Sequence, residues 1–90
     1  MPKYIIEREI PGFGQSSPEE FKAGAQTSNA AIQEMDHKVQ WLHTYVIGDG
    51  TYCVYIAPNK EAIMEHARLS GFPVTRIKEV KTIIDPTTGE

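Results

Sequence analysis

Hydrophobic and polar residues alternate along residues 41–57, and this alternation predicts a β-hairpin. Two such runs flank the segment Gly48–Gly50, which is typical of a tight turn between antiparallel strands. A three-residue loop there pairs Val46 with Tyr52 and directs a largely aliphatic face toward a core. Because a shift of one residue would mismatch the two faces, the pattern favours this register. The opposite face then carries a chemically different set of side chains: Trp41, His43, Tyr45, Cys53, Tyr55 and Ala57.

The segments before the hairpin predict a strand and a helix. Lys3–Ile10 is rich in Ile and Tyr and precedes a turn-forming Pro-Gly-Phe-Gly sequence, so we expect a strand there. Ser17 and Glu20 have the spacing of a capping box, with Pro18 at the first helical position. Small and hydrophobic residues then recur every three or four positions, as on one face of a helix: Phe21, Ala25, Ser28, Ile32 and Met35.

The segments after the hairpin predict a second helix and a last strand. Asn59 is a suitable N-cap for a helix over residues 60–70, and Gly71 is a suitable C-terminal stop. Residues 76–84 form the expected last strand. The order β-α-β-β-α-β predicts an α+β, ferredoxin-like fold in a single domain, residues 1–90. Such a fold has a four-stranded antiparallel sheet with two helices on one face.

The helix-free face of this sheet, here called the open face, is where we expect a partner. Three large aromatic residues, Trp41, Tyr45 and Tyr55, lie on it in the predicted register. Exposed aromatic patches are unfavourable in water, and small proteins of this plan commonly cover the open face with a second subunit. We therefore expect a homodimer through the open face, a ligand pocket over it, or both.

Composition and charge argue against several partners. The formal net charge is −3, and the nine Lys and Arg residues form no run, which argues against nucleic-acid binding. No stretch approaches the ~20 apolar residues of a membrane span. The early charge of Lys3 argues against a secretory signal, and the single Cys53 cannot form an internal disulfide. We therefore expect a cytoplasmic protein.

The first strand contributes a carboxylate to the open face. Its alternate positions Tyr4, Ile6, Arg8 and Ile10 form the more apolar set, despite the charge of Arg8. We assign that set to the core side because successive side chains of a strand point to opposite faces. Glu7 is then expected on the open face.

Glu7 would there join His43 and Cys53. Carboxylate, imidazole and thiol groups are ligands of borderline divalent metals such as nickel, zinc and copper. They are also components of general acid–base and nucleophilic sites. His66, on the second helix, is a further candidate ligand. The structural alternatives are a packing role for His66, an inert buried Cys53 and a solvated Glu7.

The hairpin also resembles a known family. The segments Trp41–Val46 (Trp-x-His-Thr-Tyr-Val) and Tyr52–Tyr55 (Tyr-Cys-Val-Tyr) are similar to those of short bacterial proteins catalogued as a domain of unknown function. A characterised member of that family binds nickel, and the likeness extends over nearly the whole chain. The resemblance implies a ferredoxin-like subunit that dimerises, binds Ni²⁺ and serves in nickel sequestration or response. The residues that match the family pattern are Glu7, His43, Tyr45, Cys53 and Tyr55.

Three functional hypotheses follow. The first is a dimeric nickel-binding protein that uses His43 with Glu7 and either Cys53 or His66. The second is a small dimeric α+β barrel enzyme or small-molecule-binding protein with a pocket on the open face. In that hypothesis His43 acts as a general base oriented by Glu7, and the tyrosines hold an aromatic substrate. The third is a dimer in which the open face is only an interface.

Overall fold

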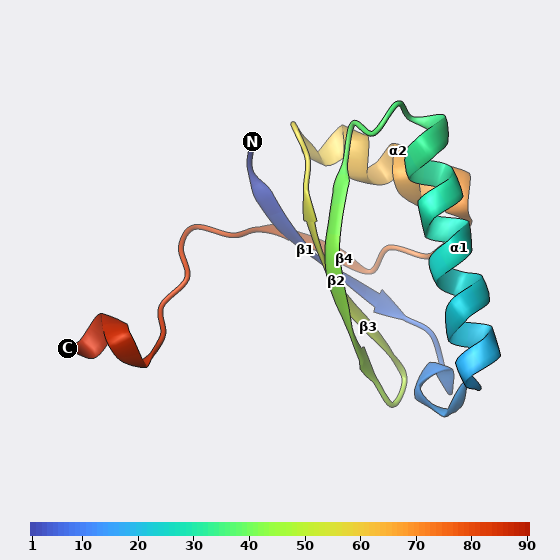
Figure 1. Cartoon of the computed structure of the whole chain (residues 1–90), viewed down its shortest axis with the longest axis horizontal. Helices are drawn as coiled ribbons and strands as arrows, with labels where there is room; N and C mark the ends of the chain where they lie inside the picture. The colour runs from blue at the N-terminus through green and yellow to red at the C-terminus, as the bar shows by residue number, and fades with distance from the viewer.

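The protein folds as a four-stranded antiparallel sheet with two helices covering one face (Figure 1). The computed structural model describes all of residues 1–90. The sheet order is β2-β3-β1-β4, which confirms the predicted ferredoxin-like arrangement. The elements, with two short 3₁₀ helices labelled η, are β1 (Lys3–Glu9), η1 (Phe13–Gln15), α1 (Pro18–Glu34), β2 (Gln40–Ile47), β3 (Gly50–Ile56), α2 (Lys60–Ser70), β4 (Arg76–Glu79) and η2 (Pro86–Gly89).

Both α-helices begin with the caps that the sequence predicts. The Ser17 hydroxyl accepts the N–H of Glu20 at 3.1 Å, and the Glu20 carboxylate accepts the N–H of Ser17 at 2.9 Å. At the start of α2, the Asn59 side chain accepts the N–H of Ala62 at 2.9 Å. Gly71 ends α2 with a φ of 81°, a left-handed conformation that glycine adopts without strain.

The hairpin register differs from the predicted one, and the difference exchanges the faces of β3. Tyr45 pairs with Tyr52, whereas the predicted three-residue loop would pair Tyr45 with Cys53. A shift of one residue moves every side chain of a strand to the opposite face. Cys53 and Tyr55 therefore belong to the core beneath the helices and not to the open face.

A β-bulge in β2 changes the position of Trp41. The ladder between β2 and β3 shifts between Trp41 and His43, so that Leu42 is the extra residue. Trp41 pairs with Tyr55 and packs, partly buried, against the core, so it lies on the helix side and not on the open face. Beyond the bulge, His43 and Tyr45 are exposed on the open face.

Contacts with β1 and the turn that follows it stabilise this register. A Cβ atom on Gly50 would lie 2.1 Å from the carbonyl oxygen of Arg8, so only glycine fits beside the end of β1. The N–H of Ile10 donates to the Asp49 carbonyl at 2.9 Å, and the N–H of Gly12 donates to the Asp49 carboxylate at 2.9 Å. The bond between Gly12 and Asp49 joins residues 37 apart in the sequence. It therefore cannot be predicted from the hairpin sequence alone.

The hydrophobic core lies between the sheet and the helices. In β1, Tyr4, Ile6 and Arg8 are buried, which confirms the predicted core side of that strand. In α1, burial begins only at Ser28. No helix has the length and apolar character that a membrane span requires. The core cluster consists of Tyr4, Ile6, Ile32, Met35, Val39, Cys53, Tyr55, Ala57, Ala62 and Ile63.

The last strand is shorter than predicted. β4 ends at Glu79 rather than near residue 84, and the N–H of Val80 makes the last bond to β1, at the Lys3 carbonyl. The chain from Lys81 to Glu90 is exposed throughout and extends away from the body of the protein (Figure 1). The strand ends early because β1 offers no further backbone partner before Lys3.

Candidate functional site

The structure separates the predicted metal ligands onto two sides of the sheet. Glu7 and His43 lie on the open face, whereas Cys53 and His66 are buried on the helix side. The structure contains no group of three His, Cys, Asp or Glu side chains that could hold a metal ion. The predicted convergence of Glu7, His43 and Cys53 is therefore wrong, because the placement of Cys53 depended on the incorrect register of β3. His66, the further candidate on α2, is buried away from Glu7 and His43.

The open face presents charged and aromatic side chains. The Arg76 guanidinium donates to the Glu7 carboxylate at 2.9 Å, and this hydrogen bond and the charge of Glu7 raise the pKa of Arg76 above its usual value. The His43 ring packs edge-on against the Tyr45 ring, with 5.0 Å between ring centroids. Tyr52 lies between Tyr45 and Glu7 in the ladder and is itself exposed.

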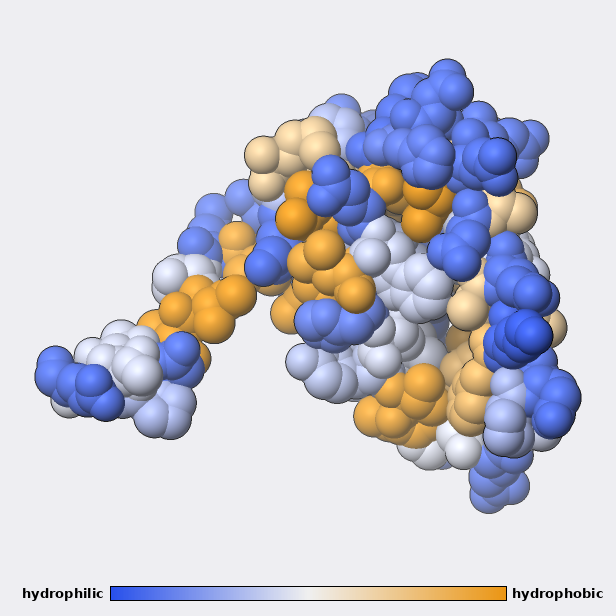
Figure 2. All heavy atoms as spheres, in the orientation of Figure 1, coloured by the Kyte–Doolittle hydropathy of each residue, from blue (hydrophilic) through white to orange (hydrophobic).

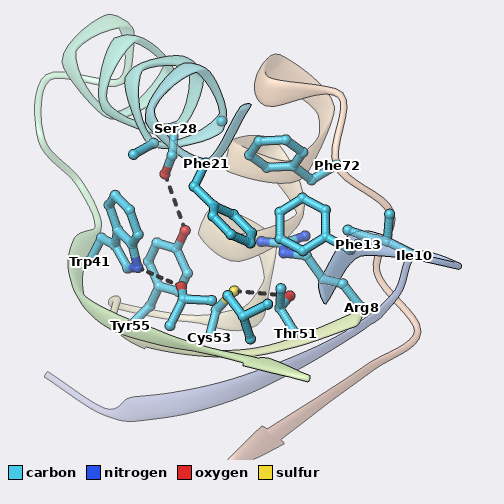
Figure 3. A pocket seen from close by; sticks show the side chains of 14 residues that line it. Arg8, Ile10, Phe13, Phe21, Ser28, Trp41, Thr51, Cys53, Tyr55 and Phe72 are labelled. Carbon is cyan, nitrogen blue, oxygen red and sulfur yellow. Dashed lines mark hydrogen bonds between the residues drawn. The ribbon is translucent and has the colours of Figure 1, made fainter. Parts of the chain in front are cut away.

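A pocket lies on the opposite side of the sheet, beneath the N-terminal half of α1 (Figure 3). Its volume is about 240 Å³. The strands β1 and β3 contribute Arg8, Thr51, Cys53 and Tyr55 to it, and β2 contributes residues that include Trp41. The remaining lining comes mainly from η1, α1 and the segment after α2.

Small side chains on α1 leave this space open. Gly24 and Ala25 line the pocket, and a Cβ atom on Gly24 would meet no atom within 4 Å. Phe13 and Phe21, in edge-to-face contact with ring centroids 5.4 Å apart, line the pocket near the start of α1. Figure 2 shows apolar and pale atoms between the sheet and the hydrophilic outer face of α1.

Arg8 is the charged residue in the pocket lining. Its side chain is buried, with 3% of the residue exposed. One terminal nitrogen, Nη1, donates to the Pro73 carbonyl at 2.8 Å, and the guanidinium carbon lies 5.7 Å from the centre of the Phe72 ring. The other terminal nitrogen, Nη2, is buried and has no hydrogen-bond partner.

A chain of polar groups runs from the pocket into the core. The Tyr55 hydroxyl lies 3.3 Å from the Ser28 hydroxyl, which lies 3.2 Å from Nε2 of His66. Burial raises the pKa of Tyr55, so its hydroxyl remains protonated at neutral pH. Burial lowers the pKa of His66, so its ring is held neutral.

Two further polar contacts lie at the pocket. The Trp41 indole N–H donates to the Thr44 hydroxyl at 2.9 Å. The Cys53 thiol lies 3.5 Å from the Thr51 hydroxyl and is buried. A buried thiol in such surroundings behaves as a small hydrophobic group.

The sequence therefore singled out several pocket residues but assigned them to the other side of the sheet. Trp41, Cys53 and Tyr55 line the helix-side pocket, and His43 does not, so the predicted grouping of Trp41 and Tyr55 with His43 on the open face is wrong. The pocket residue missed as a functional candidate is Arg8. The sequence did indicate that Arg8 is unusual, because it is a charged residue among the apolar residues on the core side of the first strand.

Comparison with known proteins identifies the family of this chain. No curated protein matches the chain. Among solved structures, the chain is similar to SCO4226 from Streptomyces coelicolor A3(2), with a TM-score of 0.75 and 18% sequence identity over 91% of this chain and 99% of that chain. At this identity the likeness shows the fold alone. The family model described as "Nickel responsive protein SCO4226-like" matches residues 4–80, and the chain therefore belongs to this SCO4226-like family.

Proposed function

We propose that this protein binds a small, largely apolar organic molecule in the pocket beneath α1. The observation that carries this proposal is a cavity of about 240 Å³ in a chain of 90 residues, with nine hydrophobic residues among the fourteen that line it. The pocket is a partly open cleft with mainly apolar walls, a form that small-molecule sites commonly take. Ligand sites typically combine apolar walls with a few oriented polar groups, which Arg8 and Tyr55 supply here.

The polar groups of the pocket support binding rather than acid–base chemistry. The protonated Tyr55 hydroxyl can donate or accept a hydrogen bond, and the Cys53 thiol is buried beside Thr51. The imidazole of His66 is occupied by Ser28 and does not line the pocket. We therefore infer a binding protein and assign no catalytic residue.

The test compares ligand binding by the unmodified protein with binding by a variant whose pocket is filled by an added aromatic ring. Cinnamamide, a small neutral aromatic compound, is titrated into the protein while the indole N–H signal of Trp41 is followed by NMR. Trp41 is the only tryptophan and lines the pocket. We expect a saturable shift that is lost in Ala25→Phe, because the new ring occupies the space, and kept in Ala23→Phe, whose side chain is exposed on the same helix.

Two outcomes would contradict the proposal. The first is the absence of a saturable shift in the unmodified protein. The second is equal binding by Ala25→Phe and the unmodified protein, with Ala25→Phe shown to be folded by its amide spectrum.

A second candidate function is nickel binding, which the family description favours. Within one chain the residues do not fit such a site, because no three candidate ligands converge and Glu7 is paired with Arg76. Nickel could still bind between two copies of the chain. We infer that the open faces of the two copies meet and bring their His43 side chains together. The exposed apolar side chains of Ile5, Tyr45 and Tyr52 on that face support such a contact.

Calorimetry with nickel chloride tests this second candidate. We expect one ion bound per two chains, with binding lost in His43→Ala and retained in the control His37→Ala, which removes an exposed histidine outside the sheet. Sedimentation of the unmodified protein should show a dimer. Unchanged nickel binding by His43→Ala, or a monomer at all concentrations, would rule out this site.

A further inference from the structure

Arg8 carries a positive charge that no carboxylate of its own chain neutralises. A guanidinium remains protonated at any physiological pH, and a charge removed from water needs a partner to offset its lost hydration. The ion pairs in the protein join Arg76 with Glu7 and Lys38 with Glu65, and neither involves Arg8. The electrostatics of the pocket therefore favour a negative group supplied from outside the chain.

Contacts on one side orient the guanidinium of Arg8 and leave one nitrogen free. The Pro73 carbonyl accepts from Nη1, and the Phe72 ring lies 5.7 Å from the guanidinium carbon. Nη2 is buried and unpaired. Leaving a buried charged donor without an acceptor is costly, so this nitrogen marks a place where an acceptor is expected.

Aromatic rings surround the rest of the space. Figure 3 shows the guanidinium extending inward among the side chains that line the pocket. Flat apolar molecules pack favourably against aromatic side chains through stacked and edge-to-face contacts. A ligand with an anionic end and a flat apolar body would match both parts of the pocket. The aromatic lining residues are Phe13, Phe21, Trp41, Tyr55 and Phe72.

We propose that the ligand is an aromatic monocarboxylate whose carboxylate accepts a hydrogen bond from Nη2 of Arg8 while its ring lies among these side chains. This inference rests on the proposed function, because it names the ligand class for the same pocket. One buried positive charge matches a singly charged group rather than a doubly charged phosphate. The volume of about 240 Å³ suits a ligand with one or two rings.

The experiment compares acids with their neutral carboxamides, which have nearly the same shape. Benzoate, phenylacetate and cinnamate are each titrated against the corresponding amide, with dissociation constants measured by NMR at pH 7. For the best-fitting pair, we expect the acid to bind about tenfold or more tightly than the amide, the range typical of a hydrogen bond to a charged group. In Arg8→Met this preference should disappear while the amide still binds.

The outcomes separate this inference from the proposed function. Equal or tighter binding of every amide by the unmodified protein overturns the carboxylate assignment and leaves the pocket as a neutral-ligand site. Absence of binding by every compound overturns both. The comparison on the unmodified protein needs no variant, so it decides the question even where Arg8→Met fails to fold. Arg8→Lys, which keeps the charge but not the planar fork, should retain part of the preference for the acid.

Discussion

His66 shows how burial sets the chemistry of one side chain. It is 1% exposed, and its ring lies 5.1 Å from that of Tyr55. Burial lowers its pKa, the hydrogen bond with Ser28 acts in the opposite direction, and the charge of Arg8 lowers it further. The structure therefore agrees with the alternative of a packing role for His66, in which a neutral imidazole links α2 through Ser28 of α1 to Tyr55 of the sheet.

This lowered pKa predicts a loss of stability in mild acid. Below about pH 6.5 the unfolded chain binds a proton at His66 while the folded protein does not, so protonation favours unfolding. The free energy of unfolding should fall as the pH drops from about 6.5 toward the lowered folded-state pKa, by at most about 1.4 kcal/mol per pH unit from this group. Urea denaturation at a series of pH values measures this slope.

His66→Gln provides the comparison for that prediction, since a neutral amide can still bond to Ser28. Its stability should depend less on pH between 7 and 5 than that of the unmodified protein. His37→Gln removes an exposed imidazole and serves as the control. Equal slopes for the unmodified protein and His66→Gln would show that His66 does not cause the loss.

At the scale of elements, α1 combines a well-packed half with a half that stands over the pocket. Its buried residues are Ser28, Ala31 and Ile32, whereas Gly24 and Ala25 line the cavity. Glycine within a helix is less favourable than alanine because its backbone loses more conformational freedom on folding. Gly24 therefore keeps the pocket open at some cost to helix stability, whereas Ala25 does so at none.

Gly24→Ala should stabilise the protein by about 0.5–1 kcal/mol. The added methyl group meets no atom within 4 Å, so the gain in helix propensity is not offset by a clash. Chemical denaturation measures the change. A decrease in stability would contradict the presence of open space at this position.

The β2–β3 turn provides a matched pair of glycines. A Cβ atom on Gly50 would collide with the backbone carbonyl of Arg8, and its φ of 157° is unfavourable for other residues, whereas a Cβ atom on Gly48 would meet nothing within 4 Å. Gly50→Ala should therefore destabilise the protein by about 1–3 kcal/mol, as expected for an added group in a filled space. Gly48→Ala should cost clearly less in the same denaturation assay. Equal effects would contradict the observed register.

At the scale of the whole molecule, the C-terminal segment stands apart from the packed body. Every residue from Lys81 to Glu90 is exposed, and Ile83 and Ile84 are 68% and 75% exposed. Figure 2 shows hydrophobic residues along this extended segment, away from the rest of the protein. The segment therefore contributes no core contacts to its own chain.

Removal of residues 82–90 should leave the free energy of unfolding nearly unchanged, within about 0.5 kcal/mol. The last bond between this end of the chain and the sheet is made by Val80, which the shortened protein retains. Thermal and urea denaturation of the two forms at equal protein concentration make the comparison. A marked loss of stability would show that the segment packs on another copy of the chain.

Local signals along the chain were sufficient for the element order and for most element boundaries. The capping box at Ser17, the cap at Asn59 and the stop at Gly71 act through hydrogen bonds and backbone conformations within a few residues. The buried face of β1 followed from simple alternation, including the charged Arg8. Such features depend on neighbours in the sequence, so they can be recognised without tertiary structure.

The assignment of the hairpin side chains depended on contacts that are distant in the sequence. The two-residue turn next to the Arg8 backbone and the bulge at Leu42 decide that Cys53, Tyr55 and Trp41 lie beneath the helices. Alternation gives two faces but does not say which one the helices cover, because a shift of one residue exchanges them. The helix-side pocket and its unpaired guanidinium arise only when β1, β3 and α1 pack together.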